Sequence, residues 1–278
     1  MPEGDTLHRT ADGLRSHLVG RVVSRARAGG PGALPRTDRL TGSIVTAVEA
    51  LGKNLIIRFD NGLEIRTHLR MNGSWHRYRP GESWRRPVAR ARLVLEVPGT
   101  VAVCFDAPVV ELLETRAEGL HPALAALGSD LLAADFETAG RAEALRRLRD
   151  PARARRPIAE VLLDQRALAG IGNVYKSEVL FIGRVDPWQR VDAIGEETLE
   201  GLVDSARRLL VLNADRRHRP ERVTTGRDRA AGGQALWVYD RAGRPCRRCG
   251  TLIRRRSQGS ELPRLTFWCP RCQGSGPA

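Results

Sequence analysis

The first residues after Met1 pair a nucleophile with an acid–base group. Removal of Met1 would leave Pro2 with a free secondary amine, and Glu3 follows at once with a carboxyl group. An α-amino group has a pKa of roughly 8, so part of it is uncharged near neutral pH and can attack a carbon. Attack on a carbonyl or sugar carbon forms an iminium, as Schiff-base lysines do. Because chain ends are usually frayed, this chemistry requires elements that hold Pro2 in place.

Four of the five cysteines form two C-x-x-C pairs near the C-terminus. Cys246 and Cys249 make one pair, and Cys269 and Cys272 make the other. This spacing predicts a four-cysteine zinc ribbon, in which the thiolates close a tetrahedral, structural site for one Zn²⁺. A redox role is the alternative. Cys104 stands alone in an apolar segment and is expected to be a core residue.

The net charge indicates a polyanionic partner. Lys and Arg total 46 against 32 Asp and Glu, which gives +14. The simplest such partner is nucleic acid, and a solvated basic surface is the alternative. Only two of the basic residues are lysines, Lys53 and Lys176. Arginine serves where a fixed charge suffices, so each lysine is either a candidate for proton transfer or a chance survivor of codon bias.

Arginines fill the stretch between the two cysteine pairs, including Arg254, Arg255 and Arg264. A zinc-stapled hairpin with arginines along it is suited to gripping phosphates or entering a groove. In L51-G-K-N-L55, Lys53 beside a glycine can neutralise a phosphate or move a proton. The alternative for Lys53 is a solvated turn residue.

Two further motifs suggest contact with nucleic acid. In H68-L-R-M-N-G-S-W75, Met71 is either a core plug or a wedge that unstacks bases, and Arg70 beside it is a candidate contact. In A169-G-I-G-N173, the glycines permit a tight turn. Asn173 then begins a helix whose free N–H groups can hold a phosphate. An ordinary helix–turn–helix is the alternative.

The surrounding segments predict what positions these residues. A helix is expected over 6–19, capped by Asp5, and its apolar stripe would anchor Pro2 and Glu3. Residues 21–115 form short alternating runs, with a hairpin signal at 60–62, which indicates a sandwich or barrel. Residues 123–215 carry helical patterns, and 214–235 are expected to be a loop.

Motifs along nearly the whole chain resemble those of a known family: P2-E-G-D, L51-G-K-N, H68-L-R-M-N-G, L127-G-S-D-L-L, G170-I-G-N-V-Y and R264-L-T-F-W-C-P-R-C272. The family is that of formamidopyrimidine-DNA glycosylase and endonuclease VIII. The resemblance implies an α+β multidomain fold with a β-sandwich catalytic domain over 1–124. It also implies a helix–two-turn–helix domain over 125–232 and a zinc ribbon over 233–278.

The resemblance also implies residue roles in removing a damaged base. Pro2 resembles the nucleophile that attacks C1′, and Glu3 the acid–base group that opens the sugar. Lys53 and Arg264 resemble residues that hold phosphates and assist β- and δ-elimination. Asn173 resembles a backbone contact by the lesion. Met71 is similar to the residue that fills the hole left by the extruded base, with Arg70, Arg254 and Arg255 as further DNA contacts.

One departure from the family pattern bears on the substrate. Members specialised for 8-oxoguanine usually carry an arginine and a phenylalanine in the region where this chain reads D106-A-P-V-V-E-L-L113. The resemblance therefore favours the endonuclease VIII branch and oxidised pyrimidines in double-stranded DNA. The alternatives are a glycosylase specific for 8-oxoguanine or formamidopyrimidine and a non-enzymatic zinc-ribbon protein that binds damaged DNA.

The location of the protein follows from what its sequence lacks. No apolar run reaches the ~18 residues of a membrane span, and residues 1–20 are polar where a secretory signal would be apolar. We expect a soluble monomer without membrane partners, cytoplasmic and associated with the nucleoid through DNA.

Overall fold

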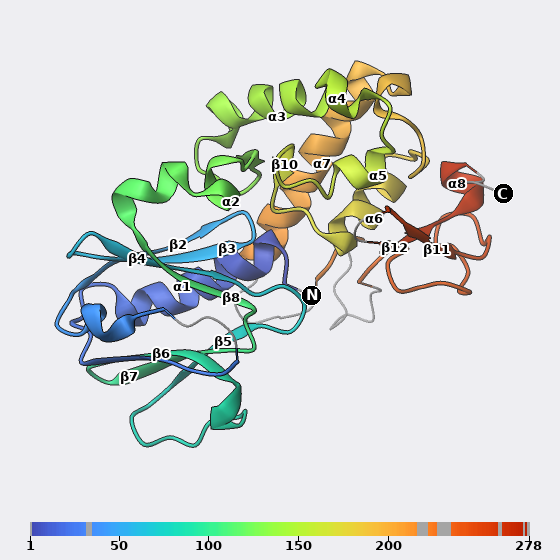
Figure 1. Ribbon diagram of the computed structural model, residues 1–278. Coiled ribbons are helices and arrows are strands. Elements are labelled where there is room, and N and C mark those ends of the chain that lie inside the picture. Colours follow the sequence, from blue (N-terminus) through green and yellow to red (C-terminus); the bar gives the residue numbers. More distant parts are fainter. Residues whose placement is uncertain are drawn as a thin grey trace. The chain divides into compact units, whose positions relative to one another are not determined.

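The computed structural model describes residues 2–31, 35–215, 222–226, 235–260, 263–274 and 276. The chain forms two compact units, Met1–Ala126 and Leu127–Ala278 (Figure 1). Within the expected 214–235 loop, residues 216–221 and 227–234 lie outside the described part. None of the described helices is long and apolar enough to cross a membrane.

The first unit contains two four-stranded antiparallel sheets. One has the order β1-β6-β7-β5, with β1 at Arg25–Ala28, β5 at Ser74–Tyr78, β6 at Ala91–Val97 and β7 at Thr100–Phe105. The other has the order β2-β3-β4-β8, with β2 at Val45–Leu51, β3 at Asn54–Phe59, β4 at Leu63–His68 and β8 at Val109–Glu114. Side chains from both sheets share one apolar core, which confirms the expected β-sandwich.

The predicted hairpin at 60–62 is present. Strand β3 turns through Asp60-Asn61-Gly62 into β4, and Gly62 has φ 76°. A left-handed backbone of this kind is what an Asn-Gly turn supplies. Cys104 lies on β7 with no exposed surface, and burial raises the pKa of its thiol. This strand places it in the core, as expected.

Helix α1 spans Gly4–Leu18 and packs beside β2 (Figure 1). Its apolar stripe of Leu7, Leu14 and Leu18 enters the sandwich core. The expected cap at Asp5 was wrong. The helix starts earlier because the Glu3 carbonyl already accepts hydrogen bonds from the backbone N–H groups of residues 6 and 7. Asp5 therefore lies buried inside the first turn, where a carboxylate suits the helix dipole.

The second unit is helical and carries the cysteine-rich hairpin. Its helices are α3 at Arg141–Leu148, α4 at Pro151–Ala154, α5 at Ile158–Val161, α6 at Asn173–Ile182, α7 at Glu196–Ala214 and α8 at Pro270–Gln273. Its strands are β9 at Ser129–Asp130, β10 at Leu168–Ala169, β11 at Arg254–Gln258 and β12 at Arg264–Trp268. Helix α2, Pro122–Ala125, ends the first unit. Short 3-10 or π turns lie at Thr37–Leu40, Val88–Arg90, Thr115–Leu120, Phe136–Gly140 and Val191–Ala193.

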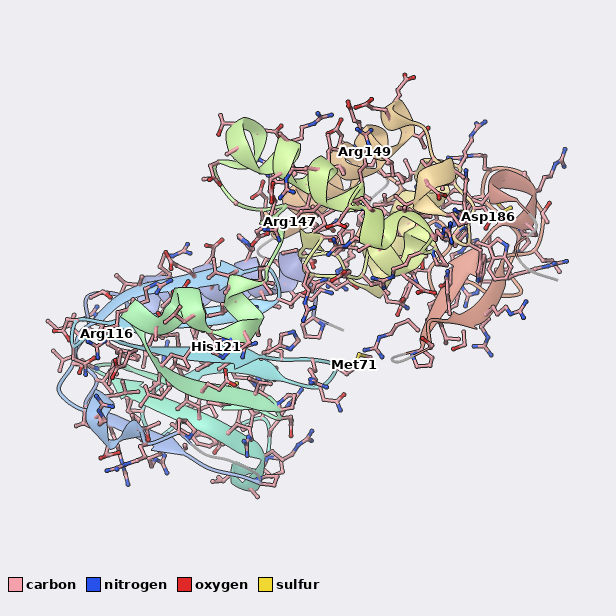
Figure 2. All side chains as sticks on the ribbon, turned by 45° about the horizontal axis from the view of Figure 1, so that its top comes forward. Met71, Arg116, His121, Arg147, Arg149 and Asp186 are labelled. Carbon is pink, nitrogen blue, oxygen red and sulfur yellow. The ribbon has the colours of Figure 1, made fainter. Side chains whose placement is uncertain are left out.

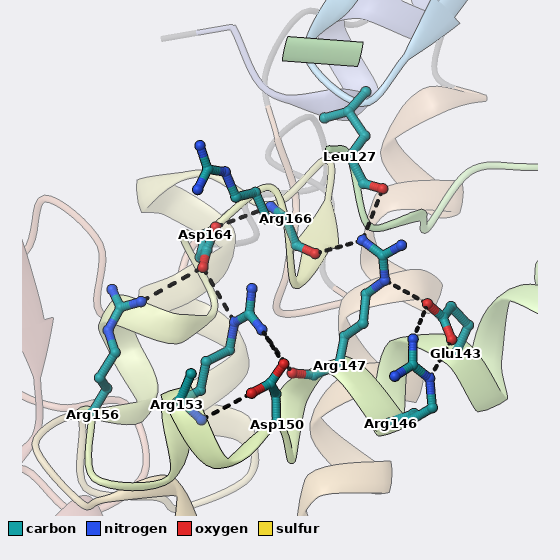
Figure 3. A network of polar contacts seen from close by, with 10 residues as sticks. Leu127, Glu143, Arg146, Arg147, Asp150, Arg153, Arg156, Asp164 and Arg166 are labelled. Carbon is teal, nitrogen blue, oxygen red and sulfur yellow. Dashed lines mark hydrogen bonds and ion pairs between the residues drawn. The ribbon is translucent and has the colours of Figure 1, made fainter. Parts of the chain in front are cut away.

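A network of arginines and carboxylates fixes the segment that leads into α6 (Figure 3). Arg147 on α3 donates to the carbonyls of Leu127 and Arg166, at 3.0 and 2.9 Å. Arg153 on α4 bonds Asp164 at 3.3 Å. Backbone groups that would be unpaired in this irregular segment are thereby satisfied. The network positions the chain just before the glycine turn at 170–172.

Candidate functional site

The N-terminal pair is ordered by the first turn of α1. Glu3 has no exposed surface, and Pro2 is half-buried. The Glu3 carbonyl accepts hydrogen bonds from Thr6 at 2.9 Å and Leu7 at 3.1 Å. Leu7 is buried in the core, so its hydrogen bond to the Glu3 carbonyl holds Glu3 beside the sandwich. The arrangement supplies the anchoring that a nucleophilic Pro2 requires.

Lys53 lies in the turn between β2 and β3, beside a histidine that sequence reasoning did not single out. Strand pairing places Asn54 opposite His68. Burial, followed by the charges of Arg66, Lys53 and Arg70, lowers the pKa of His68 to about 4. His68 is therefore neutral at physiological pH, and its Nδ1 accepts a hydrogen bond from the Arg70 N–H at 3.2 Å. The hairpin signal at 60–62 could have predicted this neighbourhood, because it fixes the register of β3 against β4.

The turn after β4 presents Met71. Its side chain is 55% exposed and stands at the tip of the turn in Figure 2, so it is not a core plug. The turn closes through a hydrogen bond of 2.9 Å from the Gly73 N–H to the Leu69 carbonyl. A Cβ at Gly73 would lie 2.6 Å from that oxygen, so only glycine fits. Arg70 has φ 45°, a left-handed backbone conformation that residues other than glycine rarely adopt.

In the second unit, the structure brings Asn173 and the Arg264 strand together. Asn173 Nδ2 donates to the Leu265 carbonyl at 2.8 Å. Lys176, 1% exposed on the next turn of α6, donates to the same carbonyl at 3.3 Å and to Thr266 Oγ1 at 2.8 Å. Asn173 thus bonds the residue next to Arg264. A phosphate held by Arg264 would lie close to the start of α6, where the positive end of the helix dipole favours anions.

Glu178 is a second buried group that the sequence pattern did not reveal. It is fully buried and accepts hydrogen bonds of 2.7–2.8 Å from the backbone N–H groups of residues 237–239, as well as one from Thr224. Burial raises the pKa of its carboxyl, and these hydrogen bonds oppose the rise. Glu178 therefore ties α6 to the chain entering the cysteine ribbon. The sequence signal that could have identified it is a charged residue among the apolar positions of α6.

The four paired cysteines converge at one point. Their Sγ atoms all lie within 4.8 Å of one another. Cys246 and Cys272 are 4.0 Å apart, and Cys249 and Cys269 are 3.5 Å apart. Tetrahedral zinc with Zn–S bonds of ~2.3 Å separates its sulfurs by roughly 3.8 Å, so the donors fit the ion. Hydrogen bonds from Thr251 lower the pKa of Cys249 to about 6, whereas burial raises the pKa of Cys269 and of Cys272. Zinc binds thiolates, so binding of the ion would draw the protons from these two cysteines.

The cysteines hold one structural zinc ion, because they offer a closed set of four donors. The ion links the two C-x-x-C turns that flank β11 and β12. Arg254 and Arg255 on β11 are exposed, as is Arg264 on β12. The zinc site therefore fixes a hairpin that presents arginines to solvent.

Three known domain families match successive parts of the chain. The formamidopyrimidine-DNA glycosylase N-terminal domain matches residues 1–108, and the formamidopyrimidine-DNA glycosylase H2TH domain matches residues 127–217. A zinc finger found in FPG and IleRS matches residues 243–274. These matches follow the same order as the sandwich, the helical segment and the cysteine ribbon.

Curated proteins resemble the chain over its full length. It is 43% identical over 282 residues to a probable endonuclease 8 2 of Streptomyces coelicolor, covering 100% of this chain and 95% of that protein. It is 42% identical over 276 residues to the DNA-(apurinic or apyrimidinic site) lyase Nei2 of Mycolicibacterium smegmatis, covering 98% and 99%.

A solved complex between the Lactococcus lactis Fpg and an abasic site containing DNA shares the fold. It covers 98% of this chain and 99% of its own, with a TM-score of 0.81 and 22% identity. Taken with the ordered domain matches and the full-length relatives, this shows that the chain belongs to the formamidopyrimidine-DNA glycosylase/endonuclease VIII family, whose members are bifunctional DNA glycosylases and abasic-site lyases of base excision repair.

Proposed function

We propose that the mature protein, with Met1 removed, excises oxidised pyrimidines from double-stranded DNA and then cleaves the strand by β,δ-elimination. The observation that carries this proposal is the ordered N-terminus, with Glu3 fully buried and Pro2 half-buried at the start of α1. A nucleophile must be held near the attacked carbon to be effective. A frayed terminus would not meet that requirement.

The reaction begins at the sugar. The nitrogen lone pair of Pro2 attacks C1′ and the glycosidic bond breaks. The base leaves with the bonding electrons and gains the proton that the Pro2 nitrogen loses. Glu3 donates a proton to the ring oxygen as the C1′–O bond opens, which produces the iminium. Proton transfer by a positioned carboxyl group contributes typically 10²–10⁴-fold in rate, and Glu3 is the acidic side chain adjacent to Pro2.

Elimination follows from the iminium. It acts as an electron sink, so loss of a C2′ proton expels the 3′ phosphate, and a second elimination expels the 5′ phosphate. Water then hydrolyses the iminium and frees Pro2. Lys53 assists the first elimination by holding phosphate, and Arg264 assists the second.

We assign the contacts with the DNA phosphate backbone to α6 and to the zinc hairpin, formed by β11 and β12. Asn173 and Arg264 belong to segments joined through the Leu265 carbonyl, which supports a shared phosphate site. Arg254 and Arg255 add positive charge along the exposed face of β11. Met71, with Arg70 beside it, occupies the space left by the flipped base. Flipping costs a few kcal/mol, less when the base pair is already damaged.

Two observations favour pyrimidine lesions. The segment after β7 lacks the arginine–phenylalanine pair of 8-oxoguanine-specific members, and relatives that span the chain are named endonuclease 8. DNA binding by a chain of net charge +14 would hold the monomeric enzyme at the nucleoid.

A lesion panel tests the substrate class. Single-turnover cleavage should be measured on matched duplexes that contain thymine glycol, 5-hydroxyuracil or 8-oxoguanine. The proposal predicts faster cleavage of both pyrimidine lesions than of 8-oxoguanine. Faster cleavage of 8-oxoguanine would favour the alternative specificity, and binding without any cleavage would favour a non-enzymatic damage-binding protein.

A further inference from the structure

The turn that carries Met71 is held by a side chain from a distant segment. Arg86 Nη1 donates to the Asn72 carbonyl at 3.2 Å, directly after the methionine. The same nitrogen donates to Asp106 Oδ2 at 2.5 Å. One guanidinium therefore connects the turn after β4 to the residue that follows β7.

Asp106 is itself fixed in an unusual conformation. Its φ is 53°, which L-residues rarely adopt, and its N–H donates to the Arg90 carbonyl at 3.0 Å. Its other carboxylate oxygen accepts from Arg90 Nε at 2.8 Å. Partial burial raises the pKa of Asp106, but hydrogen bonds from Arg90 and Arg86 outweigh this effect and lower it. These contacts hold Asp106 in one conformation.

The segment before Arg86 is anchored by aromatic packing. The Trp84 ring stacks 6.0 Å from the Tyr78 ring and meets the Phe105 ring edge-on at 5.7 Å. The Arg85 N–H donates to the Tyr78 hydroxyl at 3.1 Å. Phe105 directly precedes Asp106, so both ends of the Arg86–Asp106 pair rise from one packed cluster. The guanidinium reaches Asn72 from a rigid base.

We infer that Arg86 and Asp106 are positioning residues that hold the Met71 turn in the orientation needed to displace a stacked base. The inference rests on the wedge role proposed for Met71. A mobile turn would have to be ordered when DNA binds, and that ordering lowers the free energy available for opening the stack. Holding the turn in place therefore speeds the reaction most where a base must be extruded from the duplex, and least where no base stack is opened.

Arg86 and Arg90 provide a matched pair of variants. Each bonds the Asp106 carboxylate, but among the described residues only Arg86 also reaches Asn72. R86A and R90A remove the same charge and one ion pair each. D106N removes no positive charge, so it separates bracing of the turn from a direct contact between Arg86 and DNA.

The experiment compares two rates for each variant: excision of thymine glycol from a duplex, and β-elimination at a preformed abasic site in a single strand. We expect R86A and D106N to slow duplex excision by about tenfold or more, since small misplacements at a reacting centre are costly. Single-strand elimination should stay close to wild type, which also reports that each variant is folded. R90A should match wild type in both assays.

M71A separates failure of this inference from failure of the proposed wedge. If M71A leaves duplex excision unchanged, Met71 is not the wedge, and the proposed role fails. If M71A slows duplex excision while R86A and D106N do not, the wedge stands and the brace is contradicted. Equal losses in R86A and R90A would also contradict the brace, because the contact with Asn72 would then be irrelevant.

Discussion

At the scale of single residues, burial decides the charge of His68, which comes just before the turn that carries Arg70 and Met71. His68 lies among Arg66, Lys53 and Arg70, and burial together with these charges lowers its pKa to about 4. A protonated histidine there would add another positive charge to a cluster that already repels it. The neutral ring instead accepts a hydrogen bond from Arg70 and helps to shape the turn before Met71.

His68 makes stability depend on pH. Its pKa falls from 6.5 in the unfolded chain to about 4 in the folded protein. Between these values the unfolded state binds more protons, so the free energy of unfolding should decrease as the pH is lowered from 6.5 towards 4. H68Q cannot be protonated and should lose less stability over that interval. Urea unfolding of both proteins at pH 7 and pH 5 measures the difference, and an identical pH dependence would contradict this account.

At the scale of elements, the zinc hairpin is docked on α6 by a buried polar chain. Lys176 Nζ donates to Thr266 Oγ1 at 2.8 Å, and that hydroxyl donates to Gln258 Oε1 at 2.8 Å. Gln258 in turn donates to the Pro187 carbonyl at 3.1 Å. Buried networks of this kind specify one arrangement when every member is satisfied. The orientation of Arg264 therefore depends on a lysine that is itself inaccessible to DNA.

Removing either end of the Lys176–Thr266 contact should destabilise the second unit. K176M keeps much of the volume but removes the donor, and we expect a loss of about 1–3 kcal/mol in the free energy of unfolding. T266V removes the partner hydroxyl. Because the two groups touch, the double variant should be less destabilised than the sum of the singles by at least about 0.5 kcal/mol. Additive losses in urea unfolding would mean that the contact does not couple the elements.

Several elements could be predicted because their signals are local. Asp60-Asn61-Gly62 specifies a hairpin, and the cysteine spacing specifies the zinc knuckles. The start of α1 was misplaced, since the Glu3 carbonyl rather than the Asp5 side chain begins the hydrogen bonding. Glu178 was missed because its partners, the backbone N–H groups of residues 237–239, are distant in sequence. Sequence periodicity identifies a buried face but does not identify which backbone will satisfy a buried charge.

At the scale of the whole molecule, the net charge of +14 should dominate DNA affinity. Phosphate contacts release counterions, so affinity falls linearly with salt on a logarithmic plot, by a slope of about 0.9 per contact. R264A should weaken binding equally to damaged and undamaged duplexes and reduce the slope by about 1. R116A is the control, since Arg116 is exposed and paired with Glu114, and it should leave the slope unchanged. A loss confined to one lesion would show that Arg264 reads the base instead.

The most direct test concerns the amine of Pro2. Protein whose N-terminal sequence begins at Pro2 should be incubated with abasic-site DNA and sodium borohydride, beside a preparation that retains Met1. We predict a covalent adduct with the processed protein, mapped to Pro2 by peptide mass spectrometry, and none with the Met1-retaining protein. An adduct on Lys53 or Lys176, or equal trapping by both preparations, would contradict the assignment of Pro2 as the nucleophile.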